Sequence, residues 1–113
     1  MAITIETLGN KARLTISDPF DSHSYKDFKN AYSPLISNNA VQEIEVDISM
    51  VNYLDSGALG MLVLLNETAK NAKKTITLVS VPGRVTDILK MAHADKLFSI
   101  NLPSGMKLDM QRN

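Results

Sequence analysis

The start of the chain alternates between apolar and polar residues. This alternation covers residues 3–6 and returns over residues 12–16. A period of two is typical of a β-strand that buries one of its faces. Gly9 and Asn10 separate the two stretches, and both residue types tolerate the positive φ angles of a tight turn. The pattern therefore predicts an antiparallel hairpin at the start of the chain.

After the hairpin the pattern becomes helical. Over residues 28–36 apolar side chains recur at spacings of three and four, which predicts a helix with one buried stripe. Ser24 and Asp27 have the spacing of a capping box at the start of this helix. Pro34 lacks a backbone N–H and clashes with the preceding turn, so we expect a kink or an early end near Ser33.

The rest of the chain alternates strands with helices. We expect strands at 43–48, 75–81 and 97–100, and helices at about 57–73 and 85–92. Strands that alternate with helices pair in parallel, whereas the opening hairpin adds an antiparallel edge. The predicted fold class is therefore α/β, with a mixed five-stranded sheet and three or four packed helices in one domain over residues 1–113. Beyond Pro103 the pattern allows either an edge strand or a flexible tail.

The composition removes several classes of function. The 12 basic and 12 acidic residues balance, and no basic run of the kind that binds nucleic acid or an anionic membrane is present. The absence of Cys excludes disulfides, Cys-ligated metals and thiol nucleophiles. The start lacks the features of a signal peptide, and no segment is long and apolar enough to cross a bilayer. We therefore expect a cytoplasmic protein without membrane insertion.

Candidate chemistry is concentrated where the third strand ends and the second long helix begins. Asp55 and Ser56 directly precede the apolar stripe of that helix, so Ser56 falls at or beside its N-terminus. Backbone N–H groups lack partners there, and Asp and Ser are preferred as caps. A second interpretation is compatible with capping. A phosphate on Ser56 would add about −1.5 to −2 charge at this position and repel a partner docked on the unmodified hydroxyl.

The same segment resembles the signature of STAS domains, and most closely that of the bacterial anti-sigma-factor antagonists. In that family a strand and a short loop lead into Asp-Ser-Ser/Thr-Gly-Leu-Gly-x-Leu at the start of a helix. Residues 55–62 read Asp-Ser-Gly-Ala-Leu-Gly-Met-Leu. The match places Ser56 on the phosphorylated serine of the family and Asp55 on the acidic residue before it. Gly57 and Ala58 depart from the pattern, and without a hydroxyl at position 57 Ser56 is the single candidate acceptor.

The resemblance covers nearly the whole chain. Residues 20–22 are similar to the loop before the first helix of the family, whose Asp lies near the phosphorylated serine. Residues 78–100 are similar to its closing strand, helix and strand. The resemblance implies a partner-binding surface formed by Asp21, Ser22, Asp55, Ser56, Gly57, Leu59 and Met61.

The resemblance also implies a mechanism. The unphosphorylated protein binds an anti-sigma factor that carries a serine-kinase domain of the histidine-kinase-like ATPase type. Phosphorylation of Ser56 by that kinase dissociates the complex, and a metal-dependent serine phosphatase restores the free serine. ATP and metal belong to those two enzymes, so we expect this chain to be no enzyme and to hold no cofactor. The output pathway, whether transcription, biofilm, motility or secretion, stays open.

A second function shares the same fold. Some STAS domains are accessory subunits that dock on a membrane transporter and regulate lipid or anion transport. A serine directly after Asp55 favours the phosphorylation switch over this alternative.

An enzymatic or metal site has little support in the sequence. His23 and His93 are separated by most of the chain and lack convergent partners, which favours surface or capping roles. Asp21, Asp47 and Asp55 could converge at one end of the sheet, but capping of loops and helix ends explains them better than a metal site.

Several other residues admit plain structural interpretations. Lys70, Lys73 and Lys74 close the second long helix, where a solvated C-terminus explains them. Met61 and Met91 lie on helices beside the candidate site, and Met suits adaptable interfaces as well as cores. Core packing is favoured for each methionine taken singly.

Overall fold

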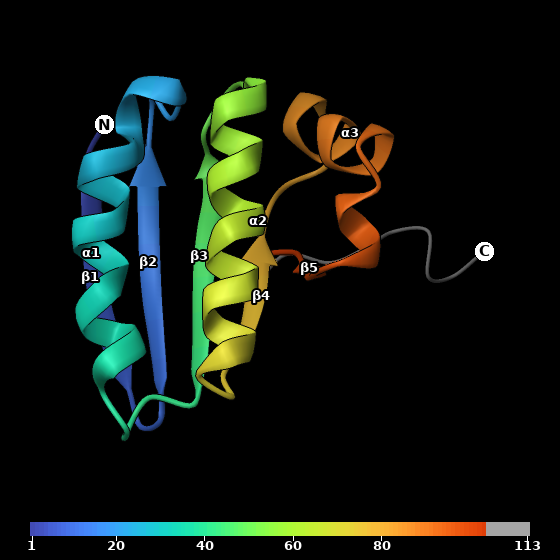
Figure 1. Cartoon of the computed structure of the whole chain (residues 1–113). Coiled ribbons are helices and arrows are strands. Elements are labelled where there is room, and N and C mark those ends of the chain that lie inside the picture. Colours follow the sequence, from blue (N-terminus) through green and yellow to red (C-terminus); the bar gives the residue numbers. More distant parts are fainter. Residues whose placement is uncertain (104–113) are drawn as a thin grey trace.

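The computed structural model describes residues 1–103, and it has the predicted α/β architecture (Figure 1). The alternatives for the segment beyond Pro103 lie outside the described residues. In chain order the elements are β1 (Ile3–Leu8), β2 (Lys11–Ser17), η1 (Ser22–Ser24), α1 (Tyr25–Ser37), β3 (Glu43–Met50), α2 (Ser56–Asn71), β4 (Thr75–Val79), α3 (Arg84–Met91), η2 (Ala94–Lys96) and β5 (Ser99–Asn101). The two η elements are short 3₁₀ turns.

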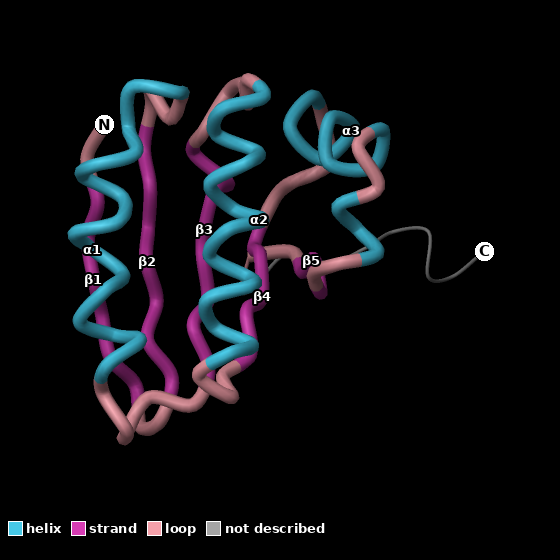
Figure 2. The backbone as a smooth tube through the Cα atoms, in the orientation of Figure 1, coloured by secondary structure: helices cyan, strands magenta, loops and turns pink. Residues whose placement is uncertain are grey.

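The five strands form one mixed sheet in the order β1-β2-β3-β4-β5. The first pair is antiparallel and the other three pairs are parallel, so the predicted pairing is confirmed. Helices α1 and α2 lie side by side over the same face of the sheet, and α3 lies beyond β4 (Figure 2). The register aligns Leu14, Val46, Leu78 and Ile100 across four strands, and the first three of these are fully buried.

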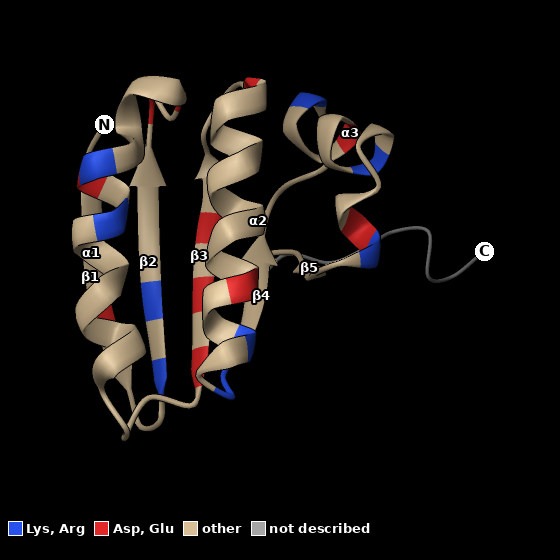
Figure 3. Cartoon of the chain, in the orientation of Figure 1, with Lys and Arg blue, Asp and Glu red and all other residues tan. Residues whose placement is uncertain are grey.

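Charged residues alternate with the buried residues on β2 and β3 (Figure 3). Glu45 is nearly buried, and its carboxylate accepts a hydrogen bond from Arg13 Nε at 2.6 Å and pairs with Lys11 Nζ at 2.9 Å. Burial alone would raise the pKa of Glu45, but the two cations outweigh it and lower the pKa. The carboxylate is therefore ionised, and it ties β3 to β2 next to the core.

Helix α1 continues through Pro34 to its end at Ser37, so the expected early end near Ser33 is wrong. Pro34 and Asn30 are both exposed, so the Asn30 carbonyl that loses its helical partner can bind water. The buried stripe that holds the helix on the sheet extends across the proline and consists of Phe28, Tyr32 and Leu35. Burial of these side chains outweighs the missing hydrogen bond.

The expected capping box of Ser24 and Asp27 is also wrong. Ser24 makes no side-chain cap on α1, because its backbone already has helical angles as the last residue of η1. Instead the Ser24 Oγ accepts a hydrogen bond from the Asp21 backbone N–H at 3.1 Å, and Asp21 accepts one from the His23 N–H at 2.9 Å. The capping box therefore forms one turn earlier, on η1.

Two of the plain structural interpretations need correction. Helix α2 ends at Asn71, and Lys74 is buried with its Nζ donating to the carbonyls of Asn38 at 2.9 Å and Val41 at 2.5 Å. Lys74 thus fastens the connection between α1 and β3, and it is not a solvated helix end. Met91 is 80% exposed and takes no part in the core.

Candidate functional site

The Asp55–Ser56 segment lies at the end of the sheet where β3 stops and α2 starts (Figure 1). Ser56 is the first residue of α2, and its side chain is exposed. The η1 turn lies against the same end of α2, because the backbone N–H of Ser22 donates to the carboxylate of Asp55 at 3.1 Å. The structure therefore brings together the two segments that the family resemblance assigned to one surface.

A single carboxylate holds this junction. One oxygen of Asp55 accepts from the Ala58 N–H at 2.8 Å and caps α2, and the other accepts from the Ser22 N–H. The hydrogen bond from Ala58, with that from Ser22, lowers the pKa of Asp55 below its ordinary value. Asp55 is thus ionised at neutral pH, and it stabilises the helix start and the η1 turn at once.

Because the Asp55 carboxylate accepts two backbone hydrogen bonds, we expect its contribution to folding stability to depend on pH. A carboxylate whose pKa is lowered by folding stabilises the folded state above its unfolded pKa, and the contribution is lost as the pH falls through the folded value. Asp55→Asn is expected to be less stable than the wild type at neutral pH, and the gap should narrow below about pH 4. Urea unfolding at a series of pH values measures this, with Ser56→Ala as a control that should follow the wild-type profile. If the difference in stability between the wild type and Asp55→Asn did not change with pH, the stabilising role of the ionised Asp55 carboxylate would be contradicted.

Gly57 departs from the family pattern for a steric reason. A Cβ atom at this position would lie 2.5 Å from Ser22 Cβ and 2.8 Å from Ser22 Cα. Contacts this short require the backbone of η1 to move, because the Cα atom cannot rotate away. Glycine at position 57 therefore permits the close approach of η1 to α2, and the sequence alone did not predict this.

A second link joins the loop before η1 to the loop before α2. The carboxylate of Asp18 accepts from the backbone N–H of Asn52 at 3.0 Å and from its Nδ2 at 2.6 Å. The two residues are 34 positions apart, so no local spacing pattern could have indicated the pair. Together with Asp55 it fixes the loop that presents Ser56.

The predicted partner-binding residues differ in exposure. Ser22 and Ser56 are exposed, whereas Asp21, Asp55, Gly57 and Leu59 are half-buried at the surface. Met61 is only 6% exposed and belongs to the core, so its side chain is withdrawn from the predicted surface.

Two further apolar side chains next to this segment were missed. Met50, at the end of β3, is 65% exposed, and Tyr53, in the loop before α2, is 56% exposed. A large aromatic residue in a short polar loop was the available signal for Tyr53. Aromatic residues and Met are enriched in protein–protein interfaces, so both residues join the candidate surface.

The remaining polar candidates do not form a second site. Asp47 accepts hydrogen bonds from the Ser49 N–H at 2.9 Å and from its Oγ at 2.6 Å, and the side chain of His23 is 93% exposed. Within residues 1–103 no group of three or more potential ligands could hold a metal ion. Nor does any helix in this range have the length and apolar character needed to cross a membrane.

The mixed five-stranded sheet with its packed helices defines a class of small α/β domains. Residues 3–102 match the family model described as "Mlab, STAS domain", and the chain therefore belongs to the STAS-domain family. It is 32% identical over 93 residues to a STAS-domain containing protein of Pseudomonas aeruginosa strain UCBPP-PA14, covering 82% of this chain and 90% of that protein.

Solved structures give the same fold at lower identity. The anti-sigma factor antagonist SpoIIAA in its unphosphorylated form superposes with a TM-score of 0.75 at 13% identity, covering 98% of this chain and 95% of SpoIIAA. An anti-sigma factor antagonist from Mycobacterium paratuberculosis superposes with a TM-score of 0.78 at 17% identity, covering 96% of this chain and 88% of that protein. The murine anion transporter Slc26a9 gives 0.71 at 14%, covering 86% of this chain and 17% of the transporter. The predicted STAS fold is confirmed.

Proposed function

We propose that this chain is a phosphorylation-controlled binding protein of the anti-sigma-factor antagonist type. With Ser56 unmodified, it binds an anti-sigma factor or a similar regulator that carries a serine kinase of the histidine-kinase-like ATPase type. Phosphorylation of Ser56 releases that partner, and a metal-dependent serine phosphatase reverses the modification. The observation that carries this proposal is the exposed Ser56 hydroxyl at the first position of α2, directly after the cap Asp55.

The electrostatics around Ser56 support release and not retention. Asp55 already accepts hydrogen bonds from the N–H groups of Ala58 and Ser22, so these donors are occupied. Residues 17–25 and 50–60 contain no Lys or Arg, and Figure 3 shows acidic positions at this end of the molecule. A phosphate would therefore add charge beside the ionised Asp55, between two segments that contain no Lys or Arg of their own. A partner packed on Ser56 would face both repulsion and the cost of desolvating the phosphate.

The modification itself is the direct test. Incubation with ATP and an extract of the source cells is expected to add one phosphoryl group, located on Ser56 by peptide mass spectrometry. Ser56→Ala should stay unmodified, whereas Ser37→Ala, at an exposed serine at the end of α1 and outside the predicted partner-binding surface, should be modified like the wild type. Absence of the modification, or its location on another residue, would contradict the proposal. Ser56→Ala used as bait should retain the partner and identify it.

The second candidate function is an accessory subunit of a membrane transporter. The shared fold with a segment of the anion transporter Slc26a9 is the observation behind it. In that case the bait would retain a membrane transporter, and substitutions of Ser56 would leave the binding unchanged.

A further inference from the structure

Strand β1 forms an open edge of the sheet. The sheet order places it outermost, and within residues 1–103 no other strand pairs with its outer side. The N–H of Ser17 donates to the carbonyl of Ala2, so this pair is a hydrogen-bonded pair of the antiparallel ladder. Because such pairs alternate along the ladder, the main-chain groups of Ile3, Ile5 and Thr7 point outward.

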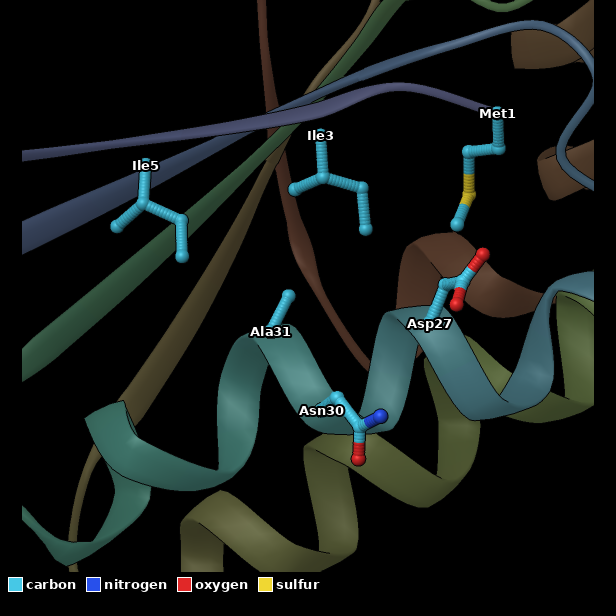
Figure 4. A pocket seen from close by; sticks show the side chains of 6 residues that line it. All are labelled: Met1, Ile3, Ile5, Asp27, Asn30 and Ala31. Atoms are coloured by element: carbon cyan, nitrogen blue, oxygen red, sulfur yellow. The ribbon is translucent and has the colours of Figure 1, made fainter.

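The edge lacks the usual protection against pairing with another chain. Natural edge strands carry Lys, Pro or bulges, but the six residues of β1 include a single charged residue, Glu6. Ile5 is 49% exposed and Leu8 is 52% exposed. Under the strand, Ile3 and Ile5 face Ala31 of α1 across a groove of about 370 Å³, which Asp27 and Asn30 also line (Figure 4). The edge therefore combines free hydrogen-bonding groups with exposed apolar side chains of β1.

We propose that this edge binds the same edge of a second copy of the chain, in an antiparallel pair centred on Ile5. In this register Ile5 faces Ile5 of the second copy, and Ile3 faces Thr7. Every outward-pointing residue of β1 then meets an outward-pointing residue of the second copy, so all of their N–H and C=O groups can form ladder bonds. The strand is thus self-complementary under a two-fold axis, which is the commonest symmetry of protein dimers.

The charge pattern selects this register. With Ile5 at the centre, Glu6 lies opposite Thr4 of the second copy, and no like charges face each other. A shift by one pair in one direction would place Glu6 opposite Glu6, which is destabilising. A shift in the other direction would leave Thr7 without a partner residue on β1.

The proposed pair joins the two five-stranded sheets into one continuous sheet. Because the two β1 strands run in opposite directions, the Ser56 ends of the two copies lie at opposite ends of this sheet. Both Ser56 surfaces stay open, and the pairing does not depend on the function proposed for them.

The test is the oligomeric state of the full chain. Sedimentation equilibrium up to about 1 mM protein detects dimers with dissociation constants as weak as millimolar. The wild type is expected to dimerise, and its Ile3, Ile5 and Thr7 amides should become protected from hydrogen exchange as the concentration rises. Ile5→Pro removes an N–H that points away from β2, so it should give a folded monomer.

Two substitutions of opposite charge at Thr4 test the register independently of the Ile5→Pro variant. Each dimer contains two Thr4–Glu6 pairs, so Thr4→Lys should lower the dimer dissociation constant about fivefold and Thr4→Glu should raise it about fivefold. A wild type that is monomeric over the whole concentration range would overturn the proposal. So would a dimer that neither Thr4 variant changes, or a monomer whose edge amides are protected by another segment.

Discussion

Ser56→Asp is expected to bind the retained partner about 100-fold more weakly than Ser56→Ala, since a charge forced into a desolvated contact costs several kcal/mol. The reason lies in the position of the side chain. Ser56 is exposed at the start of α2, beside the ionised Asp55, and no Lys or Arg in residues 50–60 could neutralise a second negative charge. Titration calorimetry with the partner captured by Ser56→Ala measures the effect.

The control places the same charge elsewhere. Asn39 lies in the exposed turn between α1 and β3, at the opposite end of the sheet from Ser56 (Figure 1). Asn39→Asp should change the affinity by less than about twofold, because charges separated by much more than a Debye length are screened. If Ser56→Asp and Ser56→Ala were both folded and bound the partner equally well, control of binding by phosphorylation would be contradicted. The transporter-subunit alternative would then be favoured.

The second large effect is expected at Gly57. Gly57→Ala should lower the free energy of unfolding by about 1–3 kcal/mol, because the added methyl group meets the Cα and Cβ atoms of Ser22 and must displace the η1 turn. Gly60 lies on the same helix, and a Cβ atom added there would have no neighbouring atom within 4 Å. Gly60→Ala should therefore raise the stability by about 0.5–1 kcal/mol through helix propensity alone. Urea unfolding of the two variants measures the change in the free energy of unfolding, which we expect to be negative for Gly57→Ala and positive for Gly60→Ala.

The Gly57 variant also tests the partner surface. Displacing η1 from α2 moves Ser22 away from Asp55, so Gly57→Ala should weaken partner binding while Gly60→Ala leaves it unchanged. If the two alanine variants were equally stable and bound equally well, the close packing of η1 on α2 would have no role in forming this surface.

Local patterns were sufficient for most elements of the fold. The alternation in the first 16 residues predicted the hairpin, and the helical stripes predicted α1, α2 and α3 within a few residues of their observed ends. The candidate site could also be predicted from neighbouring residues, because the residues that match the family signature are contiguous at 55–62. The continuation of α1 through Pro34 could not be predicted in this way, because it depends on burial of Phe28 and Tyr32, which outweighs the missing hydrogen bond.

The order of strands and helices and the place of Ser56 at a helix start follow from the amino-acid sequence alone, because both depend on periodicity and on adjacent residues. Which distant groups meet depends instead on tertiary packing. Asp55 bonds to Ser22 across 33 positions, Gly57 makes room for η1, and the main-chain groups of Ile5 face outward on an open edge. These contacts arise from how the elements pack and pair, and periodicity along the chain does not indicate them. The family resemblance placed the loop of Ser22 near Ser56, but it did not indicate the hydrogen bond to Asp55 or the room that Gly57 makes for η1.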